Sequence, residues 1–142
     1  MIGSVRENLR REVLEFGLVD CVDLSYIHRM VEEQMPGADP AELQRTTIDT
    51  IRSLVEDGLV ETGYPDENGD FVSQTWRESA RELHDAYVAQ YDDPISWFQR
   101  IFVNLTEEGV SVATSTPEGR RIAEHERLRM ESLRVAREQG ID

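Results

Sequence analysis

The residues that could carry out chemistry on their own are few and scattered. The three histidines, His28, His84 and His125, fall on three different predicted helices, and no two have the spacing of a zinc site. Cys21 is the only cysteine, which excludes an intrachain disulfide and a multi-cysteine metal site. It lies in an apolar stretch, where a small buried thiol is the expected state. We therefore expect a protein that is not an enzyme and that holds no metal or other cofactor.

An acidic turn is the second group with chemical potential. Residues 66–70 read Asp-Glu-Asn-Gly-Asp, which lacks the alternating acids and the glutamate at position 12 of a calcium-binding loop. An Asn-Gly pair between two alternating segments is typical of a β-hairpin turn instead. We predict a hairpin tip that carries carboxylates.

The charge of the whole chain limits the kinds of partner. The 142 residues carry 15 Arg and no Lys against 29 Asp and Glu, a net charge of −14. Such a field repels nucleic-acid backbones and anionic membranes and favours basic proteins. Residues 39–113 hold 5 Arg and 16 acids, whereas residues 114–142 hold 6 of each, so the acidity lies mainly in the middle of the chain. No apolar run could span a bilayer and no apolar signal segment is present, so we expect a cytoplasmic protein without a membrane partner.

Periodicity and punctuation predict the elements that would position these residues. The length suits one compact domain, and the pattern is that of the α+β class with mostly helices. Alternating residues predict strands at 59–63, 71–75 and 98–105. Apolar spacings of three and four predict helices over about 4–16, 24–35, 40–57, 75–91 and 116–139, with a short helical turn at 106–109.

Two motifs connect these elements to a known fold. Residues 54–60 (Leu-Val-Glu-Asp-Gly-Leu-Val) turn a helix through a glycine into a strand, and residues 105–109 (Leu-Thr-Glu-Glu-Gly) end a strand and cap a short helix. In this order they resemble the recognition helix, wing and closing step of winged helix-turn-helix regulators of the MarR and PadR type. The resemblance covers roughly residues 22–113. It implies a winged-helix-type domain over residues 1–113, with a helical insertion in the wing region at about 75–91, and a C-terminal helical arm over 114–142.

The charge of the expected recognition helix and wing departs from that of DNA-binding members of these families. Residues 39–75 contain only Arg45 and Arg52 against nine acids, whereas DNA binding depends on basic contacts to phosphates. DNA binding remains the alternative, because the two arginines lie seven residues apart on one helix face and a dimer would double them. The interface of this alternative consists of Arg45, Thr46, Thr47, Asp49, Arg52 and Ser53.

The last predicted helix differs from the others in having two narrow apolar faces and several Glu–Arg pairs three residues apart. Such a helix can stand partly away from the body. Two interpretations are equally open: an arm that forms a homodimer, or a packed terminal helix with a solvated face. The first face consists of Ile122, Ala123, Met130, Leu133 and Ala136, and the second of Leu128 and Val135.

The acidic residues lead to the main functional hypothesis. We expect a non-catalytic protein that binds a basic protein partner, for example as an inhibitor or immunity protein of a toxin or nuclease. The alternative is a dimeric winged-helix transcription regulator. Trp97 is most simply a core residue, but an exposed tryptophan beside acids would suit a binding hot spot. The candidate partner-binding residues are Asp66, Glu67, Asp70, Asp92, Asp93 and Trp97.

Overall fold

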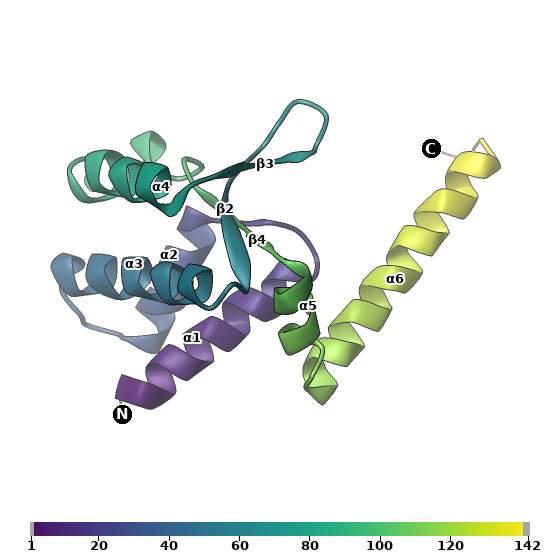
Figure 1. The fold of residues 1–142 in the computed structure, drawn as a ribbon, viewed down its shortest axis with the longest axis horizontal. Coiled ribbons are helices and arrows are strands. Elements are labelled where there is room, and N and C mark those ends of the chain that lie inside the picture. The colour runs from purple at the N-terminus through teal and green to yellow at the C-terminus, as the bar shows by residue number, and fades with distance from the viewer. Residues whose placement is uncertain (1, 141–142) are drawn as a thin grey trace.

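The chain folds into one antiparallel sheet and a set of helices (Figure 1). The structure is a computed structural model that describes the backbone of residues 2–140 and the side chains of residues 5–140. The α+β class is confirmed, with helices in the majority. In chain order the elements are α1 (Ile2–Gly17), β1 (Val22–Asp23), α2 (Leu24–Gln34), α3 (Pro40–Glu56), β2 (Val60–Pro65), β3 (Phe71–Gln74), α4 (Trp76–Glu82), the π-helix η1 (Leu83–Val88), the 3-10 helix η2 (Pro94–Ser96), β4 (Phe102–Leu105), α5 (Glu107–Ala113) and α6 (Pro117–Glu138).

The sheet has the strand order β1-β4-β2-β3, and each neighbouring pair is antiparallel. β4 is therefore central although it is last in sequence, and Val103 lies opposite both Val22 and Thr62. Along β4 the burial alternates: Val103 and Leu105 are buried, whereas Phe102 and Asn104 are half-buried. One face of this strand consequently packs on the core and the other is open.

The core is formed mainly by α1, α2, α3, η1 and the inner face of the sheet. Apolar residues spaced by three and four along each helix point inward, as amphipathic helices require. The completely buried members of this core include Leu9 and Val13 of α1, Ile27 and Val31 of α2, and Ile51 and Leu54 of α3.

The end of α3 and the start of α5 are tied together. Gly58 has φ +72°, which an L side chain rarely adopts, and it turns the chain from α3 into β2. The Thr106 hydroxyl donates to the Gly58 carbonyl at 2.7 Å and accepts from the Gly109 amide at 3.0 Å, so one side chain caps α5 and fixes the α3–β2 turn. The segments 54–60 and 105–109, which are distant in sequence, thus meet in space.

Three elements differ from the sequence-based prediction. The strand expected over 98–105 is confined to Phe102–Leu105, because residues 97–101 bend to bury Trp97 and Ile101. β1 was not expected, since two residues are too few for a period to be visible. The helix expected over 75–91 is α4 followed by a π-helix, in which the Ala89 amide bonds the His84 carbonyl five residues back.

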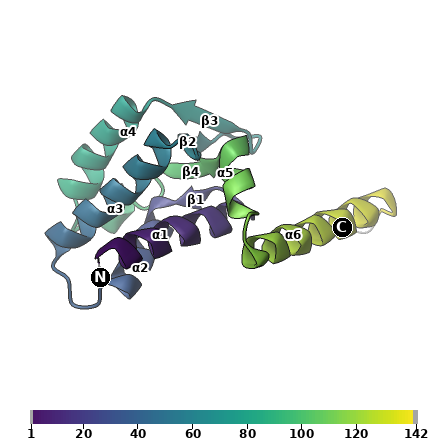
Figure 2. The same cartoon turned by 60° about the horizontal axis from the view of Figure 1, so that its bottom comes forward.

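α6 extends away from the rest of the molecule (Figures 1 and 2). Among its described residues only Gly119 is buried, while Leu128, Met130 and Leu133 are 51%, 54% and 41% exposed. Its first half is nearer to the body, because Ile122, Ala123 and Glu126 are half-buried. No helix in the described part of the chain is both long and apolar enough to cross a membrane.

Candidate protein-binding surfaces

The hairpin tip, residues 66–70, presents its acids to solvent but uses one of them internally. Asp66 Oδ1 accepts from the backbone amides of Asn68 and Asp70, both at 2.9 Å, and Gly69 has φ +84°. The Asp66 carboxylate therefore holds the turn. Glu67 and Asp70 are exposed and are the acids at the tip whose side chains remain available to a partner.

The second acidic group lies in residues 92–98, which we call the acidic loop and which contains η2. Asp92 and Asp93 are exposed, and Asp93 Oδ2 accepts from the Ser96 hydroxyl at 2.7 Å. Ile95, between them and the aromatic residues, is 90% exposed, and Phe98 is 42% exposed. The loop thus combines two carboxylates with an apolar protrusion, whereas the hairpin tip carries acids alone. The structure places these two groups on different elements and does not join them into one site.

Trp97 is not part of an exposed surface. Its side chain is 3% exposed, stacks on Tyr91 with ring centroids 5.7 Å apart, and donates from Nε1 to the Tyr91 carbonyl at 3.0 Å. The core interpretation is confirmed, and its role as a partner-binding residue is wrong, because a ring packed in this way cannot reach a partner. Trp97 instead anchors the acidic loop to the body.

A buried hydrogen-bond chain, here called the aromatic relay, joins the loop to α2 and α3. His28 Nδ1 is 2.6 Å from the Tyr87 hydroxyl, which donates to Thr47 Oγ1 at 3.1 Å. Thr47 donates its hydroxyl hydrogen to the Leu43 carbonyl at 2.7 Å. At the other end, the Tyr91 hydroxyl lies 3.1 Å from His28 Nε2.

The direction of the relay follows from counting hydrogens. Thr47 has given its single hydroxyl hydrogen to Leu43, so it accepts from Tyr87. The Tyr87 oxygen must then accept, and neutral His28 is protonated on Nδ1. Nε2 is left as the acceptor for the Tyr91 hydroxyl. Each member donates to the next, from Tyr91 through His28 and Tyr87 to Thr47.

Burial sets the protonation state of this chain. It lowers the pKa of His28 below its ordinary value, although nearby Glu32 acts in the opposite direction. Burial also raises the pKa of Tyr87 and Tyr91, so both phenols keep their protons. His28 is only 7% exposed and is therefore a buried histidine and not a surface one.

Fewer residues of α3 are exposed than the DNA-binding alternative requires. Thr47 is fully buried in the aromatic relay, and Ser53 is 6% exposed and accepts from Arg10 at 2.8 Å. These two residues cannot contact DNA, and their inclusion in that interface is wrong. Thr46 is half-buried, and η1 covers one flank of the helix, where Gln44 bonds the Tyr87 carbonyl.

Arg45, Asp49 and Arg52, the remaining residues of this alternative, are exposed. Arg52 pairs with Asp49 at 2.8 Å and lies 3.9 Å from Glu56. Arg45 is exposed on the same face, beside Asp49. The exposed face of α3 therefore offers two arginines surrounded by acids, which is little for neutralising phosphates.

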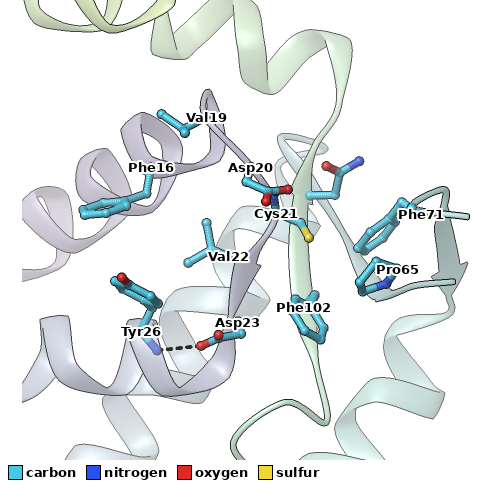
Figure 3. Close-up of a pocket in the computed structure, with 12 residues that line it drawn as sticks. Phe16, Val19, Asp20, Cys21, Val22, Asp23, Tyr26, Pro65, Phe71 and Phe102 are labelled. Atoms are coloured by element: carbon cyan, nitrogen blue, oxygen red, sulfur yellow. Dashed lines mark hydrogen bonds between the residues drawn. The ribbon is translucent and has the colours of Figure 1, made fainter. Parts of the chain in front are cut away.

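A hollow of about 590 Å³, here called the outer groove, lies beside β1 (Figure 3). The rings of Phe71 and Phe102 lie on one side of Cys21, and those of Phe16 and Tyr26 lie on the other. The charged residues in its lining are Asp20 and Asp23, both acidic. The sequence does not predict this groove, because its walls come from α1, β1, α2, β4 and the β2–β3 hairpin, several of which are distant in sequence.

Cys21 is half-buried within the outer groove. Burial, followed by the charge of Asp20, raises the pKa of its thiol, so the reactive thiolate is disfavoured. Within the described residues no cluster of three or more His, Cys, Asp or Glu side chains has a metal-binding arrangement. These observations give no chemical group that is activated for catalysis.

Comparison with known proteins finds no match. No family model matches the chain, and neither a curated protein nor a solved structure is similar to it. Any functional proposal therefore rests on the residues and their geometry.

Proposed function

We propose that the chain is a non-catalytic protein that binds a basic protein partner through the acidic loop. The observation that carries the proposal is the 90% exposure of Ile95, which follows Asp92 and Asp93 after a single proline. An apolar side chain at the centre of a contact supplies affinity, and carboxylates around it steer and orient a basic partner. An inhibitor or immunity protein of a basic toxin or nuclease would act in this way, in the cytoplasm.

The support under the loop strengthens this proposal. Trp97 is buried, Tyr91 stacks on it, and Tyr91 in turn bonds His28 of α2. A loop held at its base loses little conformational freedom on binding, so more of the contact energy remains as affinity. The hairpin tip, with Glu67 and Asp70, adds negative charge that would attract the same class of partner from a distance.

Affinity capture with matched variants tests the proposal. The immobilised chain is exposed at low salt to a lysate of the cells that produce it, and retained proteins are identified by mass spectrometry. We expect a basic protein that is lost from Asp92→Arg/Ile95→Asp, because the changes reverse one charge and remove the apolar contact. Glu67→Arg/Asp70→Arg at the hairpin tip is the matched control and should slow association with little effect on dissociation. Capture of no basic protein, or equal capture by the loop variant, would refute the proposal.

A winged-helix transcription regulator is the second candidate. Consecutive helices α2 and α3 lead into the hairpin β2–β3, and β4 returns beside β2, with α4, η1 and η2 inserted before it. This order supports a winged-helix interpretation in which α3 is the recognition helix. Salt-sensitive, submicromolar binding to mixed genomic DNA fragments, abolished in Arg45→Ala/Arg52→Ala, would favour this candidate over the first.

A further inference from the structure

In the part of the chain that the structure describes, the outer groove and the outer half of the arm, α6, both leave apolar side chains exposed. Phe16, Val19 and Tyr26 of the groove are each between 46% and 49% exposed. On the arm, Met130 and Leu133 are 54% and 41% exposed and continue the face on which Ile122 and Ala123 are half-buried. Exposed apolar side chains that gather in this way indicate an interaction surface.

We propose that the outer groove is the docking site for the arm of a second copy of this chain, and that two copies exchange arms. The arm leaves the body after α5 and extends past it, so its outer half is free to reach another molecule (Figures 1 and 2). Each copy owns one arm and one groove. A two-fold axis therefore satisfies both contacts at once and closes the assembly as a dimer.

The distribution of charge favours the arm of a second copy as the occupant of the outer groove. The arm carries 6 Arg and 5 Glu, whereas the rest of the chain carries 9 Arg and 24 acids. The bodies of two copies repel each other, and the arm is the segment in which this repulsion is absent. The groove offers only Asp20 and Asp23 as charged lining, which is opposite in sign to the arginines of the arm. In its own chain the hydrogen bond and charge of Glu126 raise the pKa of the Arg129 guanidinium, and the charge of Asp20 adds a smaller effect in the same direction.

The arm is also suited to dock as a formed helix. Ion pairs within it join Glu124 to Arg127 at 2.7 Å and Arg134 to Glu138 at 2.6 Å, and similar pairs follow along its length. Glu–Arg pairs at these spacings favour the helical form of the arm. An arm that is helical before it binds loses less entropy on docking. This inference does not depend on the basic partner proposed above, since the acidic loop lies outside the outer groove.

The test measures the mass of the full chain by light scattering between micromolar and millimolar concentrations. We expect a monomer–dimer equilibrium that shifts to monomer in the arm variant Met130→Glu/Leu133→Glu and in the groove variant Phe16→Ser/Val19→Arg. All four positions are half-exposed or nearly so, and circular dichroism verifies that each variant folds. Mixing the two variants should restore a dimer, because one intact groove meets one intact arm.

The native thiol of Cys21 reports where the arm binds. Maleimide labelling of Cys21, which lines the groove, should be about tenfold slower in the dimer than in the arm variant. A wild-type chain that stays monomeric at all concentrations would overturn the proposal. A groove variant that still dimerises, or a dimer whose Cys21 labels at the monomer rate, would place the interface elsewhere and overturn it as well. A protected thiol in a monomer would show that a chain's own arm covers the groove, which also contradicts arm exchange.

Discussion

The aromatic relay shows how single atoms decide the stability of a buried cluster. Tyr87 is fully buried, and its hydroxyl serves both His28 and Thr47. Tyr87→Phe leaves the His28 Nδ1 hydrogen and the Thr47 oxygen without their partner. We expect the free energy of unfolding to fall by about 1–3 kcal/mol in urea titrations. Tyr64→Phe, on a ring that is 43% exposed, is the control and should change it by less than about 0.5 kcal/mol. Equal effects of the two substitutions would contradict the relay.

His28 gives the protein a pH dependence with a defined sign. Because burial lowers its pKa in the folded state, the unfolded chain binds the proton more readily once the pH falls below about 6.5. The stabilisation that neutral His28 provides is complete above that value and is lost as the pH falls toward the lowered pKa. We expect wild type to lose stability relative to His28→Gln between pH 7.5 and pH 5.5.

The difference between variants is the quantity to measure, because protonation of repelling acids adds its own pH dependence to every variant. His84→Gln, on a side chain that is 77% exposed, should follow wild type at both pH values. Parallel pH profiles for His28→Gln and wild type would show that the pKa of His28 is the same in the folded and unfolded states, which would contradict this prediction.

At the scale of elements, the side chain of Thr106 joins the end of α3 to the start of α5. Thr106→Val removes the bond to the Gly58 carbonyl and the cap on the Gly109 amide. We expect a loss of about 1–2 kcal/mol in the free energy of unfolding, measured by urea denaturation. Thr114→Val is the matched control, since the Thr114 hydroxyl bonds only carbonyls of its own helix at 2.8 Å and 3.3 Å. It should cost less than about 0.5 kcal/mol, and a larger cost than that of Thr106→Val would reverse the assignment.

Local signals explain which elements were predictable. Asp39, Pro40 and Gly58 bound α3, and the Asn68-Gly69 pair marks the hairpin, because caps and turns depend on neighbouring residues. β1 exists only because β4 pairs with it, and such a partner lies outside any short window. The shortening of the strand expected over 98–105 could not be predicted, because the chain bends there to bury Trp97 and Ile101 in the core.

The candidate sites also differ in whether the sequence predicts them. Exposed acids at the hairpin tip and in the acidic loop were predictable, because surface charge follows from composition. The aromatic relay was not, although His28 lies four residues after Leu24 on the buried face of α2, and Tyr87 and Tyr91 have the same spacing. That shared spacing is the signal that could have located it. The outer groove is formed jointly by α1, β1, α2, β4 and the β2–β3 hairpin, so no short stretch of sequence signals it.

At the scale of the whole molecule, the arm should contribute little to the stability of the body. Gly119 is its only buried residue among those described. A chain that ends at Ser115 should therefore unfold within about 0.5 kcal/mol of the full chain, compared in urea at low protein concentration where both are monomeric. A much less stable shortened chain would show that the arm packs on its own body.

The net charge of −14 gives a second expectation at this scale. Surface ion pairs contribute little, so mutual repulsion among the acids dominates the long-range electrostatics. Raising the salt concentration from about 0.01 M to about 0.1 M shortens the screening length from about 30 Å to about 10 Å. We expect the urea midpoint to rise over this range. A falling midpoint would show that attractive pairs outweigh the repulsion.

The π-helix η1 determines the direction in which the chain enters the acidic loop. Each residue of a helix rotates the next by about 100°, and the wider turn of η1 absorbs the extra rotation before Tyr91 and Trp97 are reached. If Leu83–Val88 formed an ordinary helix with the same number of residues, the chain beyond it would be rotated by about 100°. The acidic loop would then face another direction without any change in its own residues. The orientation of the loop therefore depends on the π-helical turn that precedes it and not on the loop residues alone.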